Sequence, residues 1–181
     1  MKKVRTLKYF LLETNKLYDT APDIVDWYGK IDVRNIKTGS SHLLPKRLLL
    51  SIAPNPDTVF TDVICHPFLL VSSMVRDTIK LYEPNMVFKE IILLDGANEL
   101  SSVYYLPILP EVDCLSGESE LNLDRSVIKK AVISLPAVGD NSIFKIAGVT
   151  GNYIVVRLDL AESILRREAR GIGLEDIQFT G

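Results

Sequence analysis

The chain contains few of the features that mark secreted or membrane proteins. It has two cysteines among 181 residues, Cys65 and Cys114, and both lie in apolar runs. A chain of this length buries about 70% of its unfolded surface, so its core needs neither disulfides nor a metal. No stretch approaches the ~20 apolar residues of a membrane span, and the apolar patch at residues 9–12 is too short for a signal peptide. These absences predict a cytoplasmic protein with reduced thiols and no membrane partner.

Groups able to carry out catalysis are equally scarce. The chain has two histidines, His42 and His66. In an extended segment the side chains of Cys65 and His66 would point to opposite faces. Because a nucleophilic cysteine needs a nearby base, a structural role is favoured for Cys65. No cysteines or histidines have the spacing of a zinc site, and the glycines at 148–151 and 171–173 lack the context of a phosphate-binding loop. We therefore expect no catalytic residue, metal or cofactor, and a protein that is not an enzyme.

Lysine and arginine are absent between Lys89 and Arg125. This acid segment, residues 90–124, carries a formal charge of −8 in a chain whose total is −2, from eight carboxylates: Glu90, Asp95, Glu99, Glu111, Asp113, Glu118, Glu120 and Asp124. A local field of one sign speeds encounter with the opposite sign, provided that the charges stay unpaired in the folded chain. The acid segment therefore predicts a basic partner. The alternative is a charged strand edge that only prevents strand pairing, a role that lysine fills more often.

Two tyrosines, Tyr104 and Tyr105, lie inside the acid segment. In a strand one of them would point outward, and exposed tyrosine is enriched at protein interfaces. Core packing with only the hydroxyl near the surface is the more common arrangement. The carboxylates themselves could form an acid–base pair or hold a cation if they converged, but the pattern does not show which of them do.

The apolar pattern predicts an α+β fold with a mostly antiparallel sheet and two or three helices. Strands are expected at residues 6–13, 30–36, 87–94, 103–109, 129–135, 142–146 and 153–158. The runs at 87–94 and 103–109 should form an antiparallel pair, central and covered on both faces because nearly every position is apolar. Residues 37–41 should form a loop, and residues 45–50 either a short helix or a strand.

Two helices are indicated by their caps. Ser72 or Ser73 can begin a helix that runs through Tyr82. A C-terminal helix should begin at Asp159, end before Gly171 and be followed by a short strand. Its last turns contain Arg166, Arg167 and Arg170, which we interpret as stabilising the helix dipole in preference to binding phosphate or nucleic acid.

The chain length fits one domain, residues 1–181. The stretch at residues 54–57 is rich in proline and offers an alternative, a small N-terminal lobe (1–55) followed by a main domain (56–181).

Four short blocks resemble one protein family. They are Pro56-Asp57, Leu70-Val71-Ser72, a central block of Tyr104-Tyr105-Leu106 with Val112-Asp113-Cys114-Leu115 and Ser119, and the close at 170–179. In this order they are similar to a family of bacterial immunity proteins, formerly a domain of unknown function and typified by the myxobacterial immunity protein. These are antidotes of polymorphic and contact-dependent toxin systems. Residues before Pro45 match loosely, and the close has Gly171-Ile172-Gly173-Leu174-Glu175 where the family more often places a second glycine after a threonine.

The resemblance implies a non-enzymatic cytoplasmic protein that binds a cognate toxin and covers its active surface, with no catalytic residue carried over. Toxins that cleave nucleic acid are commonly basic, so an acid segment suits such an inhibitor. Nucleic acid is not an expected partner, and the oligomeric state stays open. Charge reversal at Glu118 and Glu120 should weaken toxin binding and make it less sensitive to salt. The expected partner-facing residues are Tyr104, Glu111, Asp113, Glu118 and Glu120.

Two other classes of protein stay open. A small hydrolase or transferase would place His66 with at least two carboxylates in one pocket. A scaffold or oligomerisation domain would present a large apolar surface patch.

Overall fold

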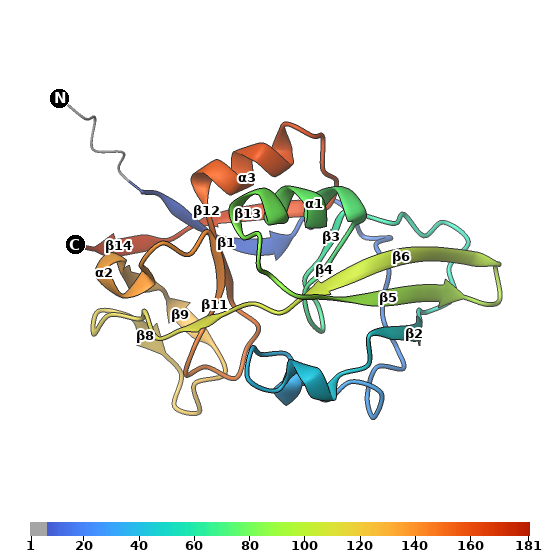
Figure 1. The fold of residues 1–181 in the computed structure, drawn as a ribbon, viewed down its shortest axis with the longest axis horizontal. Helices are drawn as coiled ribbons and strands as arrows, with labels where there is room; N and C mark the ends of the chain where they lie inside the picture. Colours follow the sequence, from blue (N-terminus) through green and yellow to red (C-terminus); the bar gives the residue numbers. More distant parts are fainter. Residues whose placement is uncertain (1–6) are drawn as a thin grey trace.

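Two five-stranded sheets make up most of the fold (Figure 1). The computed structural model describes residues 7–181. The first sheet has the order β13-β1-β12-β11-β7, formed by β1 (Tyr9–Thr14), β7 (Glu111–Val112), β11 (Ile143–Ile146), β12 (Ile154–Arg157) and β13 (Ile172–Asp176). The second has the order β2-β5-β6-β4-β3, formed by β2 (Arg47–Ser51), β3 (Val63–Ile64), β4 (Leu70–Val71), β5 (Phe88–Asp95) and β6 (Leu100–Pro107).

Two small ladders and several short helices complete the described chain. The ladders join β8 (Glu120–Leu121) to β9 (Ile128–Lys130) and β10 (Val132–Ser134) to β14 (Gln178–Thr180). The helices are α1 (Ser73–Tyr82), α2 (Leu135–Val138) and α3 (Leu158–Leu165), with single turns η1 (Val33–Asn35) and η2 (Ser41–Leu43). The expected α+β class is confirmed. Both large sheets are mixed, because each takes an edge strand in parallel: β7 on β11 and β2 on β5.

The helices α1 and α3 lie side by side where the two sheets meet (Figure 1). Helix α1 has the predicted cap, since the Ser72 side chain accepts a hydrogen bond from the Val75 amide at 3.4 Å. The Tyr82 hydroxyl donates to the Asp159 carbonyl at 3.0 Å and so joins α1 to α3. One core cluster combines Leu12 and Ile154 of the first sheet with apolar residues of the second sheet and of both helices.

Helix α3 begins differently from the prediction. Its N-cap is Arg157, without a side-chain cap, and Asp159 lies inside the first turn, where its carboxylate accepts from the Arg157 guanidinium at 2.8 Å. The same carboxylate also accepts a hydrogen bond from the Leu160 amide at 2.9 Å. Two strands follow the helix, β13 and β14, where one was expected.

The prediction of a strand at residues 30–36 is wrong. The Asp32 carboxylate accepts a hydrogen bond from the Arg34 amide at 3.0 Å, which favours the turn η1 over an extended chain. Residues 45–50 contribute to strand β2, the second of the two predicted alternatives. The strand expected at 129–135 divides into β9 and β10, and the chain enters α2 at Leu135. The strand expected at 6–13 is β1; its first residue lies outside the described chain.

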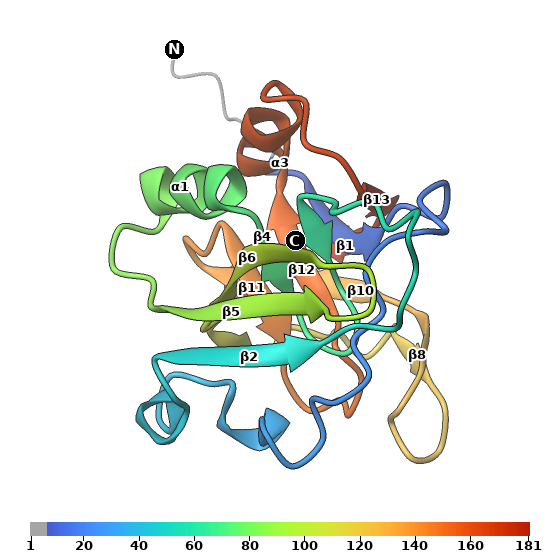
Figure 2. The same ribbon diagram turned by 90° about the vertical axis from the view of Figure 1, so that its right-hand side faces the viewer.

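Strand β5 is central, as predicted, but it is not covered on both faces. Figure 2 shows β2, β5 and β6 side by side. Ile91 and Leu93 on one face of β5 are buried. On the other face, Ile92 is flanked in register by Leu49 and Val103, whose side chains are 45% and 46% exposed. The prediction of two covered faces is therefore wrong for this part of the sheet.

Residues 7–55 pair with later parts of the chain in both large sheets. Strand β1 pairs with both β12 and β13 inside the first sheet, and β2 pairs with β5 in the second. Ile24 and Ile31 also share a core cluster with Leu70 and Ile91. Both sheets therefore depend on the N-terminal segment. None of the helices in residues 7–181 is long and apolar enough to cross a membrane.

Candidate functional site

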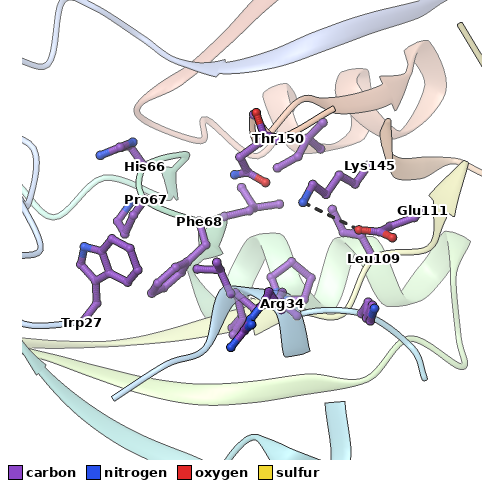
Figure 3. Close-up of a pocket in the computed structure, with 18 residues that line it drawn as sticks. Trp27, Arg34, His66, Pro67, Phe68, Leu109, Glu111, Lys145 and Thr150 are labelled. Atoms are coloured by element: carbon purple, nitrogen blue, oxygen red, sulfur yellow. Dashed lines mark ion pairs between the residues drawn. The ribbon is translucent and has the colours of Figure 1, made fainter. Parts of the chain in front are cut away.

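A cleft of about 650 Å³ lies between the two sheets (Figure 3). One wall comes from residues 27–37, another from residues 66–69, and the rest from the end of β6, from β7 and β11, and from residues 150–154. The volume is within the usual range of about 300–1,000 Å³ for small-molecule sites.

Aromatic and aliphatic side chains line much of this cleft. Phe68 is buried and its ring meets that of Trp27 edge to face, with the ring centroids 6.1 Å apart. Leu106, Leu109 and Ile154 extend the apolar lining. Such a surface would hold the apolar part of a ligand.

The charged side chains of the cleft are mostly cationic: Arg34, Lys37 and Lys145, against one carboxylate, Glu111. Lys145 and Glu111 face each other because β11 and β7 pair in parallel with these two residues in register. The distance from Lys145 Nζ to Glu111 Oε1 is 3.8 Å, longer than the 2.7–3.2 Å of a hydrogen bond. Arg34 is exposed and forms a salt bridge with Asp32 at 2.8 Å.

The arrangement expected of a hydrolase is not found among residues 7–181. His66 lines the cleft together with a single carboxylate, where at least two were expected. Figure 3 shows His66 and Glu111 on opposite sides of the cleft. The same residues contain no group of three or more His, Cys, Asp or Glu side chains that could hold a metal ion.

The two thiols are poor nucleophiles in this fold. Burial raises the pKa of Cys65 to about 11, and burial likewise raises the pKa of Cys114 to about 11. Near neutral pH both therefore stay protonated, whereas the thiolate is the reactive form. The structural role expected for Cys65 agrees with this chemistry.

Several carboxylates of the acid segment are used inside the fold, so the expectation that the segment stays uncompensated is wrong for them. Glu90 forms a salt bridge with Arg47 of the neighbouring strand, and Glu111 faces Lys145. Glu120 lies across from Lys130 in the β8–β9 ladder but is exposed and forms no salt bridge within residues 7–181, so it stays available to a partner. Each of these bases lies outside the acid segment, and the pairing became visible only once the strand order was known.

Asp95 has a structural role in the hairpin between β5 and β6. The residue is buried, and its carboxylate accepts hydrogen bonds from the amides of Asn55, Ala97 and Asn98 at 2.9–3.1 Å. The Asn98 side-chain amide adds a fourth at 2.7 Å and is the main reason why the pKa of Asp95 lies below its ordinary value. This carboxylate is unavailable to a partner.

The prediction that Tyr104 faces a partner is wrong. Its side chain is 1% exposed, and its hydroxyl donates to the Thr61 carbonyl at 2.6 Å. Burial also raises its pKa. Tyr105 on the other face is half-buried, with the Arg76 guanidinium 4.0 Å from its ring centroid. Tyr104 therefore packs in the core, which is the more common arrangement for tyrosine.

The remaining predicted residues reach the surface. Asp113 and Glu118 are exposed and form no salt bridge within residues 7–181. They lead into the β8–β9 hairpin, whose loop projects from the body of the molecule (Figure 1, yellow to gold). Leu123 in this loop is fully exposed. Leu123 lies in the hairpin, Glu118 in the turn before β8 and Asp113 directly after β7; we refer to these three exposed residues as the hairpin surface. Arg125, Lys129 and Lys130 follow them in the chain, so the hairpin as a whole is mixed in charge.

Sequence reasoning missed the cleft, including Trp27 and Lys145. One signal was present, because Lys145 interrupts an otherwise apolar strand, Ile143–Ile146. The partners that turn this lysine into part of a site come from distant segments.

Comparison with known proteins adds no assignment. No family model matches the chain, and no curated protein matches its sequence.

Proposed function

We propose that this chain is a non-enzymatic immunity protein that binds a cognate bacterial toxin in the cytoplasm and covers its active surface. Two lines support the proposal: the four sequence blocks described above, and the exposed carboxylates of the hairpin surface. The observation that carries it is a pair of exposed carboxylates without a salt bridge in residues 7–181, Asp113 and Glu118, in the segment that leads into a projecting hairpin with the fully exposed Leu123.

This combination suits a protein interface. Interfaces bury an apolar centre inside a polar rim, and a few central side chains supply most of the binding energy. Leu123 would be such a central side chain, and Asp113 and Glu118 would direct a basic partner to it. The proposed surface is smaller than the whole acid segment, because Glu90, Asp95 and Glu111 are engaged within the fold.

The proposal is tested by co-expression with the toxin encoded by the adjacent reading frame. The wild-type chain should protect the cell and co-purify with the toxin. The variant Leu123→Ser should bind at least about tenfold more weakly, as expected for loss of a central apolar contact. Leu17→Ser, at another largely exposed leucine, is the matched control and should bind like the wild type.

Two results would contradict the proposal. The first is failure of the wild-type chain to bind or neutralise the adjacent toxin. The second is equal affinity of Leu123→Ser and Leu17→Ser, which would remove the hairpin tip from the interface.

A second candidate, self-association, is favoured by one observation. Leu49, Ile92 and Val103 form an apolar row across three strands, and the two outer members are almost half exposed. Apolar surface of this kind often marks an interface. Light scattering would show a dimer that Val103→Lys dissociates; a monomer at every concentration would exclude this candidate.

A further inference from the structure

The side chain of Lys145 is unusually sheltered for a lysine without hydrogen bonds. Its neighbours in β11, Phe144 and Ile146, are fully buried on one face of the first sheet, and strand alternation directs Lys145 to the other face, into the cleft. The side chain is 26% exposed. Within residues 7–181 its ammonium has no hydrogen-bond partner, and its contact with Glu111 is 3.8 Å long. A sheltered cation with free donors favours an anionic ligand.

The charge of the cleft favours a ligand with one negative charge. The lining has three cations and one carboxylate, and Asp32 just outside it pairs with Arg34. One positive charge is therefore in excess. A carboxylate supplies a single negative charge, whereas a phosphate monoester carries about −1.5 to −2 at neutral pH.

The apolar lining indicates the rest of the ligand. Figure 3 shows Phe68 between Trp27 on one side and Lys145 on the other. Leu109 and Ile154 line the same cleft. A ligand with its carboxylate at Lys145 would therefore lay an apolar chain over Phe68 toward Trp27.

We propose that this cleft binds a small organic carboxylate with an apolar chain, held by a salt bridge to Lys145 and by burial of the chain against Phe68 and Trp27. The site shares no residue with the hairpin surface and does not depend on the proposed immunity function.

Trp27 allows a direct test, because it is the single tryptophan of the chain and lines the cleft. Its fluorescence is followed while octanoate is added, with octanol and octylammonium as probes of the same chain length. Octanoate should produce a saturable change and bind about tenfold or more tightly than octanol, because a charge-assisted hydrogen bond adds to burial of the chain. Octylammonium should bind more weakly than either.

Two variants, Lys145→Met and Glu111→Gln, and one matched control locate the charge. Lys145→Met keeps the length and apolar stem but removes the ammonium, and should reduce octanoate affinity to that of octanol. Lys129→Met, at an exposed lysine of β9, is the matched control and should leave the affinity unchanged. Glu111→Gln removes the carboxylate that competes for Lys145 and should tighten octanoate binding severalfold. This variant tests the proposal if Lys145→Met does not fold.

The proposal is overturned if octanoate leaves Trp27 fluorescence unchanged, or if octanol binds as tightly as octanoate. Wild-type octanoate affinity in a folded Lys145→Met variant, or no gain in Glu111→Gln, would also overturn it.

Discussion

At the residue scale, burial sets the chemistry of both thiols. Cys65 lies in the junction between the sheets, where its Sγ is 3.9 Å from the Leu12 carbonyl. Cys114 is packed with Ile133 and Phe144 in another core cluster. Since the pKa of each thiol is raised to about 11, the folded chain holds them as neutral groups over the physiological range.

The raised thiol pKa values predict a loss of stability at alkaline pH. Between the ordinary thiol value of 9.0 and the folded value of about 11, the unfolded chain loses protons that the folded chain retains. The contribution of the thiols to the free energy of unfolding is therefore fully present below pH 9. It should be lost as the pH rises toward 11. Burial raises the pKa of Tyr104 as well, which adds to the loss. Urea denaturation at a series of pH values measures the change.

The thiol contribution is isolated with Cys65→Ala and Cys114→Ala. Although each variant will be less stable overall, its free energy of unfolding should decline less steeply between pH 9 and 11. A flat profile for the wild-type chain in this window would show that the thiols are not desolvated.

At the element scale, the sequence predicts best those helices and turns that are set by residues close together in the chain. Helix α1 follows from the cap at Ser72 and the spacing of Val75 and Ile79, all within one short segment. The strand predicted at residues 30–36 failed because the Asp32 side chain stabilises a turn that apolar periodicity does not reveal. The parallel pairing of β7 with β11 could not be predicted, since it depends on the order of distant strands.

The same distinction explains the candidate sites. Exposure of Glu118 on a turn is a local property, set by residues close to it in the chain. The pairing of Glu90 with Arg47 and the burial of Tyr104 against Thr61 arise between distant segments, so composition alone misjudged both. For the same reason the cleft at Lys145 had no signal beyond one charged residue in an apolar strand.

Gly171 gives a prediction about how α3 connects to β13. Its φ angle is +82°, and a Cβ atom there would lie 2.5 Å from Thr61 Cβ. Gly171→Ala should therefore lower the free energy of unfolding by about 2–4 kcal/mol, from backbone strain and overpacking together. Thermal or urea denaturation provides the measurement.

Gly39→Ala is the control for this prediction, because nothing lies within 4 Å of a Cβ built at Gly39. Its free energy of unfolding should stay within about 0.5 kcal/mol of the wild type. Equal stability of the two variants would mean that the chain at Gly171 relaxes away from Thr61.

At the scale of the whole molecule, the two sheets are tied together by the N-terminal segment. Strand β1 lies between β12 and β13, and β2 forms the edge beside β5. The cleft also takes one wall from residues 27–37. Residues 7–55 are therefore part of the fold, and residues 27–37 are also part of the cleft.

Removal of residues 1–55 should consequently abolish cooperative folding. The remaining chain, 56–181, loses an interior strand of the first sheet and exposes the long edge of β5. Circular dichroism during urea denaturation should show no cooperative transition for this fragment. A sharp transition with near wild-type stability would instead support a separate main domain.

The central claim is that the hairpin surface binds a basic toxin. Its most direct test is the dissociation constant of the complex with the adjacently encoded toxin, measured as salt concentration rises. For the wild-type chain the affinity should fall with salt, because exposed charges are screened. The control Asp77→Lys/Glu162→Lys makes the same change of charge on helices α1 and α3, away from the hairpin (Figure 1).

The account predicts that Asp113→Lys/Glu118→Lys binds at least about tenfold more weakly than this control at low salt, with a flatter dependence on salt. An affinity and salt dependence equal to those of the control would contradict it.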